Sequence, residues 1–233
     1  MSLREGAALE TGYVVPVPRI ERREALHYMG WHGAALDDAL LGQMDRAEQQ
    51  LTENVRPHLI ARRFSLRNGC PDGTEYVPGG SDICELLAEC HSVILMAATL
   101  GEAADRLIRR SMLQGGSQGF ILDAAASAMI EAVCNAWENG LRKHVREENG
   151  YLTDRFSPGY GDMPLEDGRK ICNILETGKK IGLTVSASNI MLPQKSVTAL
   201  IGISDKIQKH RPAPCEVCSA RGTCALAEGR NHR

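Results

Sequence analysis

One long stretch of the chain, residues 117–148, restricts the possible folds more than any other feature. Apolar residues recur in it every three or four positions, for example at Ile121, Ala124 and Ala128, which is the repeat of one face of an α-helix. Many of these residues are alanines, and their small side chains let a neighbouring element approach closely. The pattern predicts one long helix that packs as part of the core, and we assign it no chemistry.

Two continuous apolar runs, Val93–Ala98 and Val197–Ile203, indicate strands that are covered on both faces. Other predicted strands and helices lie before, between and after these runs without a regular alternation of strand and helix. A doubly wound parallel sheet requires that alternation, so the order of elements favours the α+β class. We see no internal repeat.

Shorter elements are expected around these three. An amphipathic helix follows Asp37, and a β-hairpin is predicted with strands at His58–Leu66 and Thr74–Val77 and a turn at Pro71–Gly73. Later in the chain, residues 167–177 form a helical pattern that a glycine ends. The chain therefore divides into a lead-in at 1–17, one domain at 18–206 and a polar tail at 207–233.

The charge balance argues against two classes of partner. Lysines and arginines number 27 against 29 acidic residues, a net charge of −2, whereas nucleic-acid binders usually carry a basic excess. No block of like charges indicates a membrane-binding tail. We find no signal peptide and no apolar run of about 18 residues, the length needed to span a bilayer. A cytoplasmic protein without a nucleic-acid or membrane partner is expected.

Several common catalytic motifs are missing from the chain. It has no G-x-G-x-x-G sequence, no complete P-loop and no H-E-x-x-H sequence. Dehydrogenase, nucleotide hydrolase and zinc protease activities therefore lose support.

Two short segments carry a resemblance when they are taken together. Residues 155–160 read R-F-S-P-G-Y, and residues 191–198 read M-L-P-Q-K-S-V-T, with a predicted helix between them. This pairing resembles the activation domain of cobalamin-dependent methionine synthase, which has an R-x-S/A-P-G-Y loop and a later M-x-P-x-x-S-V segment in the same order. The detailed match covers residues 150–205. It implies a mainly antiparallel, twisted sheet flanked by helices.

The chain departs from the family pattern in two places. The family commonly reads L-T-E-S where residues 183–186 read L-T-V-S, so a carboxylate is absent. The aromatic pair that often follows S-V-S-G is replaced by Ile201 and Gly202.

The resemblance implies that the chain binds S-adenosylmethionine, and the residues of the loop suit that ligand. Arg155 could hold the ligand carboxylate through a bidentate pair. Pro158 restricts Ser157 to an extended conformation, and Gly159 permits close approach of the backbone. Tyr160 offers an aromatic face to a cation and a hydroxyl near the transferred methyl, so we assign it the catalytic position. The predicted ligand-binding residues are Arg155, Ser157, Gly159, Tyr160, and, through their backbone groups, Ile201 and Gly202.

A structural alternative stays open for the same loop. In that alternative the hexapeptide is only a turn, Arg155 pairs with Asp154 or Asp162, and Tyr160 packs on the core.

The activity that the resemblance implies is reductive methylation, which reactivates cob(II)alamin. Methyl transfer from a sulfonium to the cobalt(I) nucleophile is strongly favourable and pulls an unfavourable reduction forward. The chain has no D-x-H-x-x-G corrinoid-binding motif. The cobalamin would therefore be supplied in trans by methionine synthase or another corrinoid protein, with a separate electron donor.

The tail contains a possible metal site. Cys215, Cys218 and Cys224 form a C-x₂-C-x₅-C pattern, which could bind zinc or an iron–sulfur cluster or could remain free, oxidisable thiols. The scattered Cys70, Cys84, Cys90 and Cys134 are interpreted as core thiols.

Two other functions remain open. The chain could be a non-catalytic docking or chaperone module for a corrinoid protein that kept the fold and lost the ligand. It could also be a metal or redox module built on the cysteines of the tail.

Overall fold

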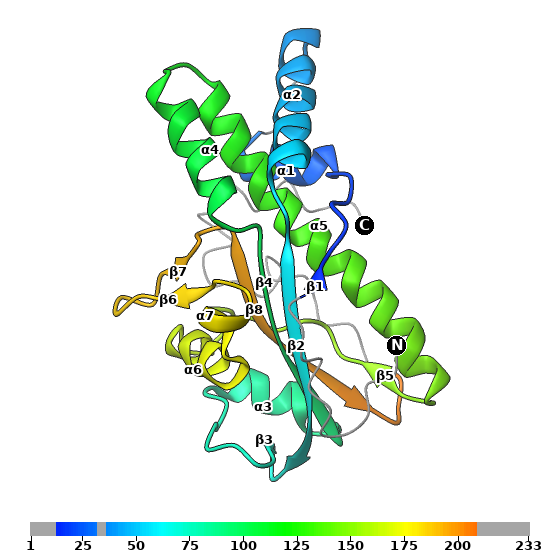
Figure 1. The fold of residues 1–233 in the computed structure, drawn as a ribbon. Coiled ribbons are helices and arrows are strands. Elements are labelled where there is room, and N and C mark those ends of the chain that lie inside the picture. Colours follow the sequence, from blue (N-terminus) through cyan, green and yellow to red (C-terminus); the bar gives the residue numbers. More distant parts are fainter. Residues whose placement is uncertain (1–12, 32–35, 209–233) are drawn as a thin grey trace.

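The two apolar runs form the middle of the sheet in the computed structural model, which describes residues 13–31 and 36–208. The central strand is β4 (Ser92–Thr99), and all of its residues are buried. It pairs antiparallel with β2 (His58–Arg67) and β8 (Ser196–Ser204) (Figure 1). Both predicted buried strands are confirmed, each extended by one residue at either end.

Short strands complete the sheet. β1 (Tyr13–Val14) pairs with β2, and β5 (Tyr151–Leu152) pairs with β8, so the order is β1-β2-β4-β8-β5. β3 (Cys70–Pro71) folds back on β2, and β6 (Thr184–Val185) pairs with β7 (Met191–Leu192) in a separate hairpin. Every pairing among the described strands is antiparallel. The predicted α+β class is confirmed.

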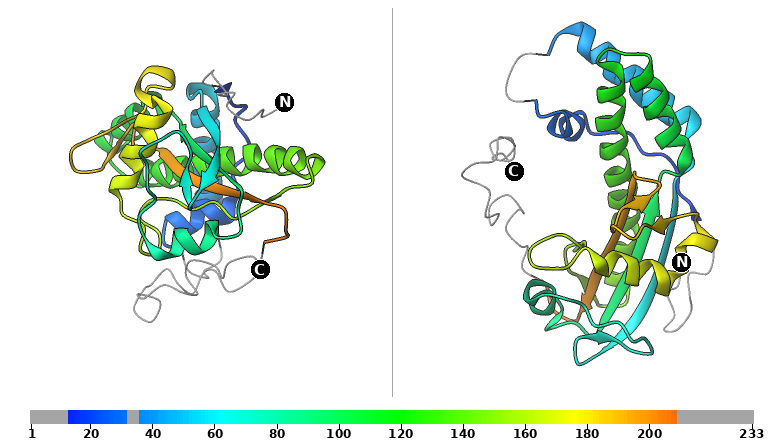
Figure 2. Two further views of the ribbon diagram at one scale, coloured as in Figure 1. Left: turned by 90° about the horizontal axis from the view of Figure 1, so that it is seen from below. Right: turned by 90° about the vertical axis from the view of Figure 1, so that its left-hand side faces the viewer.

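One face of the sheet, which we call the helix face, is crossed by α5 (Gln118–Glu147), and three further helices pack against α5. These are α1 (Arg22–Tyr28), α2 (Asp38–Asn54) and α4 (Glu102–Leu113), and α2 and α4 project beyond one end of the sheet together with the first part of α5 (Figures 1 and 2). Alternate side chains of a strand point to opposite faces, so one set from each central strand meets these helices. That set is Ile94, Met96 and Ala98 of β4 with Ala199, Ile201 and Ile203 of β8.

The other face, which we call the loop face, is covered by shorter elements. They are α3 (Ser81–Leu87), α6 (Glu166–Leu175) and α7 (Thr177–Lys180), together with long connecting loops (Figure 1). The opposite set of β4 side chains and one β8 leucine pack against them. That second core contains Val93, Leu95, Ala97, Leu200, Ile83, Ile171 and Leu175.

Helix α5 is the predicted long helix, and it forms the spine of the helix face. It packs against α1, α2 and α4 and carries thirteen buried residues. Among the described residues it is also the one helix with the length and composition of a membrane span, but 61% of its most apolar 18-residue window is buried inside the protein. Burial of that extent is what the core helix of a globular domain shows.

The predicted hairpin is correct for its first strand and wrong for its turn and its partner. The chain reverses at Asn68 and Gly69, whose φ angles are 53° and 76°, and β3 follows immediately. Two consecutive residues with positive φ form the tight turn that suits a two-residue hairpin, and Asn-Gly is the preferred sequence for it. Residues 74–77 therefore form a loop, in which Tyr76 is buried against the loop face.

Part of the expected lead-in belongs to the sheet. β1 pairs with β2, and the backbone N–H of Val15 donates to the carbonyl of Pro57 at 3.0 Å. Val15 and Val17 are partly buried against the core of the helix face. The division of the chain at residues 17 and 206 stays a prediction.

Candidate functional site

The segment with the R-F-S-P-G-Y sequence follows the free edge of β8. Thr153 donates its N–H to the carbonyl of Gly202 at 3.0 Å. Phe156 and Leu200 exchange two backbone hydrogen bonds of 2.9 and 2.8 Å. These bonds extend the sheet beyond β5 and deliver residues 157–160 to a point beside the first half of β8.

Residues 157–163 then form a compact turn. The N–H of Tyr160 donates to the carbonyl of Ser157 at 3.1 Å, and the N–H of Gly159 donates to the carbonyl of Met163 at 2.9 Å. Gly159 has a φ of +93°, a conformation that other residues rarely adopt. Tyr160 contacts the edge of the buried Phe156 ring, with 6.4 Å between centroids, and its side chain is 49% exposed. The turn therefore presents the Tyr160 ring at the surface.

A carboxylate in this turn, that of Asp162, ties it to the start of α3. Asp162 accepts the N–H and the hydroxyl of Ser81, both at 2.6 Å, and the N–H of Asp82 at 3.0 Å. The hydrogen bonds from the Ser81 hydroxyl and from the two backbone N–H groups lower the pKa of Asp162 to about 2. A side chain at Gly80 would collide with the Asp162 carboxylate, so the close approach requires glycine there.

A second carboxylate, that of Asp167 in α6, makes a buried connection to the loop that precedes α3. Asp167 is completely buried and accepts the hydroxyl of Tyr76 at 3.0 Å and the N–H of Gly79 at 2.8 Å. Lys170 donates to its other oxygen at 2.7 Å. Burial, together with the negative charge of Asp167, raises the pKa of the Tyr76 hydroxyl, which therefore remains a hydrogen-bond donor. Asp162 thus fixes the turn, and Asp167 fixes the start of α6 just after it.

Arg155 points from this segment to α5 rather than into the turn. Its Nη2 donates to Glu131 at 2.7 Å and to Asn135 at 3.2 Å, and its Nη1 donates to Glu138 at 3.1 Å. The side chain is 14% exposed. Burial alone would lower the pKa of Arg155, but Coulombic interactions with Cys134, Glu131 and Glu138 raise it overall. The arginine is paired with carboxylates, as the structural alternative held, but these come from α5.

Sequence reasoning missed the partners of Arg155. Glu138 also accepts from Arg142 at 2.6 Å, so two guanidinium groups and two carboxylates form one cluster, which we call the arginine cluster. The available signal was spacing, because Glu131, Asn135, Glu138 and Arg142 recur every three or four residues along α5 and so share one helix face.

The structure places the predicted adenine-contacting residues within the sheet. The Ile201 side chain is fully buried in the core of the helix face. Gly202 donates its N–H to the Thr153 hydroxyl at 2.8 Å, and its carbonyl accepts the Thr153 N–H at 3.0 Å. Contact with adenine through Gly202 would require these bonds to change partners. The ligand-binding roles of Ile201 and Gly202 stay predictions.

The second sequence motif connects the start of β8 to the helix face. The N–H of Gln194 donates to Asp105 of α4 at 2.9 Å, and Lys195 pairs with Asp123 of α5 at 2.9 Å. The Ser196 hydroxyl donates to the Pro193 carbonyl at 2.7 Å. In the structure these residues anchor a central strand.

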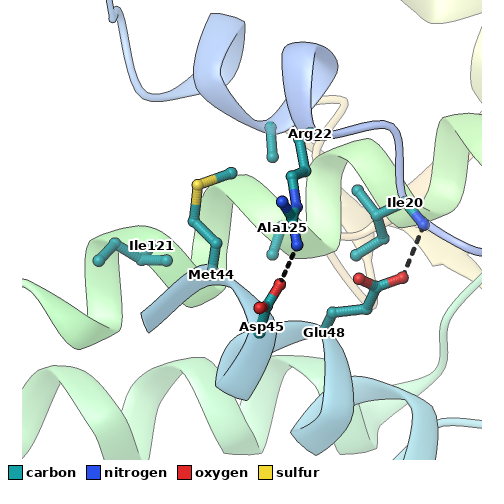
Figure 3. A pocket seen from close by; sticks show the side chains of 8 residues that line it. Ile20, Arg22, Met44, Asp45, Glu48, Ile121 and Ala125 are labelled. Carbon is teal, nitrogen blue, oxygen red and sulfur yellow. Dashed lines mark hydrogen bonds and ion pairs between the residues drawn. The ribbon is translucent and has the colours of Figure 1, made fainter. Parts of the chain in front are cut away.

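A small hollow lies on the helix face between α1, α2 and α5 (Figure 3). Arg22 pairs with Asp45 across it at 2.7 Å, and Glu48 accepts the N–H of Ile20 at 2.9 Å. Its free volume is about 10 Å³, which is room for about one water molecule. A nucleoside-sized ligand does not fit there.

The predicted metal ligands Cys215, Cys218 and Cys224 lie outside the described residues. Within residues 13–31 and 36–208, no three His, Cys, Asp or Glu side chains are grouped so that they could hold a metal ion. Of the predicted core thiols, Cys134 is buried as expected, whereas Cys84 is exposed.

Comparison with known proteins supports the fold. No protein family and no curated protein matches the chain by sequence. Among solved structures, the chain is similar to the crystal structure of the MetH reactivation domain bound to AdoHcy. The two chains are 16% identical, the TM-score is 0.59, and the match covers 94% of this chain and 90% of the other. The resemblance inferred from the two motifs is therefore confirmed at the level of the fold.

Proposed function

We propose that this chain binds S-adenosylmethionine and supports reductive methylation of cob(II)alamin held by a corrinoid protein. The observation that carries the proposal is the shared fold, which extends over nearly the whole chain to a domain solved with AdoHcy. AdoHcy is S-adenosylmethionine without its transferable methyl group. The R-F-S-P-G-Y loop, whose sequence resembles the loop of that family, supports the same ligand.

The arginine cluster suits the amino-acid end of such a ligand. That end carries one carboxylate and one ammonium, and the cluster offers a guanidinium and a carboxylate side by side in Arg155 and Glu131. On binding, the ligand carboxylate would replace Glu131 on Arg155, and the ligand ammonium would pair with Glu131. This exchange leaves every charge paired, which is the condition for placing charges in a partly buried site.

The turn at 157–160 would hold the part of the ligand nearer to the methyl group. Gly159 allows its backbone to approach a ligand, and Ser157 lies next to it. Tyr160 is half-exposed at the tip, where its ring can face a sulfonium and its hydroxyl can face the acceptor. The corrinoid supplies the nucleophile that accepts the methyl group. Tyr160 would orient the donor toward it.

The corrinoid and the electrons would come from other proteins. The chain has no D-x-H-x-x-G motif, so we propose that a cobalamin-binding methionine synthase or a related corrinoid methyltransferase is the partner in trans. An electron donor acts in the same assembly, and we propose a cytoplasmic setting for it.

One observation favours a second function, a docking or chaperone module without ligand chemistry. Arg155 already has two carboxylate partners, and both backbone groups of Gly202 are engaged by Thr153. A domain that kept the fold and lost the ligand would show such internal pairing. A metal or redox role for Cys215, Cys218 and Cys224 stays a prediction.

Calorimetric titration with S-adenosylmethionine tests the proposal. Arg155→Ala should weaken binding by about 2–3 kcal/mol, because a charge-assisted pair is lost. Arg142→Ala is the matched control, since it removes the other guanidinium of the cluster and should leave affinity nearly unchanged. Circular dichroism confirms folding, and Arg155→Lys keeps the charge if Arg155→Ala unfolds. If the wild type does not bind S-adenosylmethionine, the docking function is supported instead. If Arg155→Ala and Arg142→Ala lose the same affinity, Arg155 does not contact the ligand.

Tyr160→Phe tests the transfer step. The substitution should lower the rate of cob(II)alamin conversion to methylcobalamin while the dissociation constant changes little, because the hydroxyl acts mainly in the docked complex. The conversion is followed by absorbance on candidate corrinoid proteins with a reductant present. If S-adenosylmethionine binds and no candidate is methylated, the activator function is wrong and the docking function replaces it.

A further inference from the structure

A groove of about 390 Å³ opens between α6, α7 and β6. Its volume is within the range of small-molecule sites. None of residues 155–160 lines it, so it is separate from the site proposed above. Its polar lining consists of Arg169, Asn173, Glu176, Thr177, Lys179 and Thr184.

The guanidinium at one side of the groove, Arg169, is not neutralised by a carboxylate. Its Nη2 donates to the carbonyls of Ser186 and Ala187 at 2.8 and 2.9 Å and to the side-chain oxygen of Asn189 at 2.7 Å. All of these acceptors are neutral. A guanidinium whose hydrogen-bond acceptors are all neutral keeps an uncompensated positive charge, and an anion is the group that compensates it best.

The rest of the lining strengthens this preference. Lys179 is 85% exposed and pairs at 3.6 Å with Glu176, which also pairs with Lys180 at 3.2 Å. The hydrogen bond from Lys180 and the charges of both lysines lower the pKa of Glu176. This carboxylate therefore stays ionised, and it is shared between two lysines. The groove walls therefore have an excess of positive charge.

We propose that this groove binds a small organic anion through a carboxylate or phosphate group placed between Arg169 and Lys179. The anion compensates the charge of the Arg169 guanidinium and adds a charge partner for Lys179. The half-buried Val185 contacts the apolar part of the molecule. Arg169 also fixes the turn at 186–189, so the bound anion is held beside the β6–β7 hairpin.

Nuclear magnetic resonance of the ¹⁵N-labelled full chain tests the site, with inorganic phosphate and acetate as probes at constant ionic strength. Saturable shifts are expected at the amides of Asn173, Gly178 and Thr184, and the more effective probe identifies the preferred group. Lys179→Gln should weaken binding about threefold, as for one partly screened charge. Lys206→Gln is the matched control, because Lys206 is similarly exposed, pairs with Glu89 and does not line the groove.

Arg169→Gln should weaken binding at least about tenfold, the effect of losing a charge-assisted hydrogen bond. Because Arg169→Gln also removes the hydrogen bonds to the turn at 186–189, the result for Lys179→Gln decides whether the site exists. Shifts that do not saturate, or equal affinities for Lys179→Gln and Lys206→Gln, would overturn the proposal. Lys179→Gln should leave S-adenosylmethionine affinity unchanged, so this site and the proposed function can fail separately.

Discussion

The two faces of the sheet are stabilised by different means. On the helix face, α5 buries thirteen residues in a core of apolar side chains. On the loop face, the elements are short, and two carboxylates make the connections to residues 76–82: Asp162 from the turn at 157–163 and Asp167 from α6. Apolar packing tolerates sliding of a surface, whereas hydrogen bonds to a carboxylate define positions. The turn that presents Tyr160 is thus built on the face with the more directional contacts, whereas Arg155 is held by α5 on the other face.

Asp167→Ala gives the largest expected effect on the loop face, a loss of about 3 kcal/mol in unfolding free energy. The change leaves the Tyr76 hydroxyl and the Gly79 N–H without their buried acceptor. Leu122→Ala on the helix face should lose a similar amount through a cavity, about 2–5 kcal/mol. Urea denaturation measures both.

The two variants should differ in where the structure loosens. Hydrogen exchange at the Gly159 amide should accelerate in Asp167→Ala well before global unfolding, and in Leu122→Ala only together with it. If the Gly159 amide exchanged at the same rate in both variants, the two faces would not differ in the way proposed above.

Acid should weaken the loop face first, through Asp162. Its pKa is lowered from 3.8 to about 2, so its contribution to stability is fully present above pH 3.8 and is lost as the pH falls toward 2. The stability difference between the wild type and Asp162→Asn should therefore shrink over this range. Urea denaturation at a series of pH values measures it. If the difference in unfolding free energy between the two proteins stayed the same down to the lowest pH, the negative charge of Asp162 would not be what stabilises the turn.

Removal of residues 212–233 should have the smallest effect. The last strand within the described residues 36–208 ends at Ser204, so the unfolding free energy should change by no more than about 0.5 kcal/mol. A large fall in melting temperature would show that the tail is a structural staple, and metal analysis of anaerobically purified protein would then test for a bound ion.

The regular elements could be predicted from the sequence because their patterns are local. β4, β8 and α5 each show a periodicity within one segment, and the structure has all three within a residue of the expected bounds. The class of the fold followed from their order. The hairpin turn at Asn68 and Gly69 is also a local signal, but Pro71 and Gly73 close by have the same preference for turns, so the sequence offers two competing positions for the turn.

The candidate site was predictable only in part, because its contacts join distant segments. The loop at 155–160 was located from its motif, but the partners of Arg155 lie 17 to 24 residues earlier on α5. Asp167 reaches Tyr76 across 91 residues. No local pattern reports such pairs, since they depend on how the elements pack.

The central pair of strands has a consequence for the synthesis of the protein. The hydroxyl of Ser196 at the start of β8 donates a hydrogen bond to the hydroxyl of Thr99 at the end of β4, and 97 positions of sequence separate the two residues. At the usual elongation rate of about 5–20 residues per second, β4 waits roughly 5–20 s for its neighbour. During that time an apolar strand has one edge open, which is the form most prone to aggregation. The nascent chain should therefore benefit from protection by a chaperone until β8 emerges from the ribosome and pairs with β4.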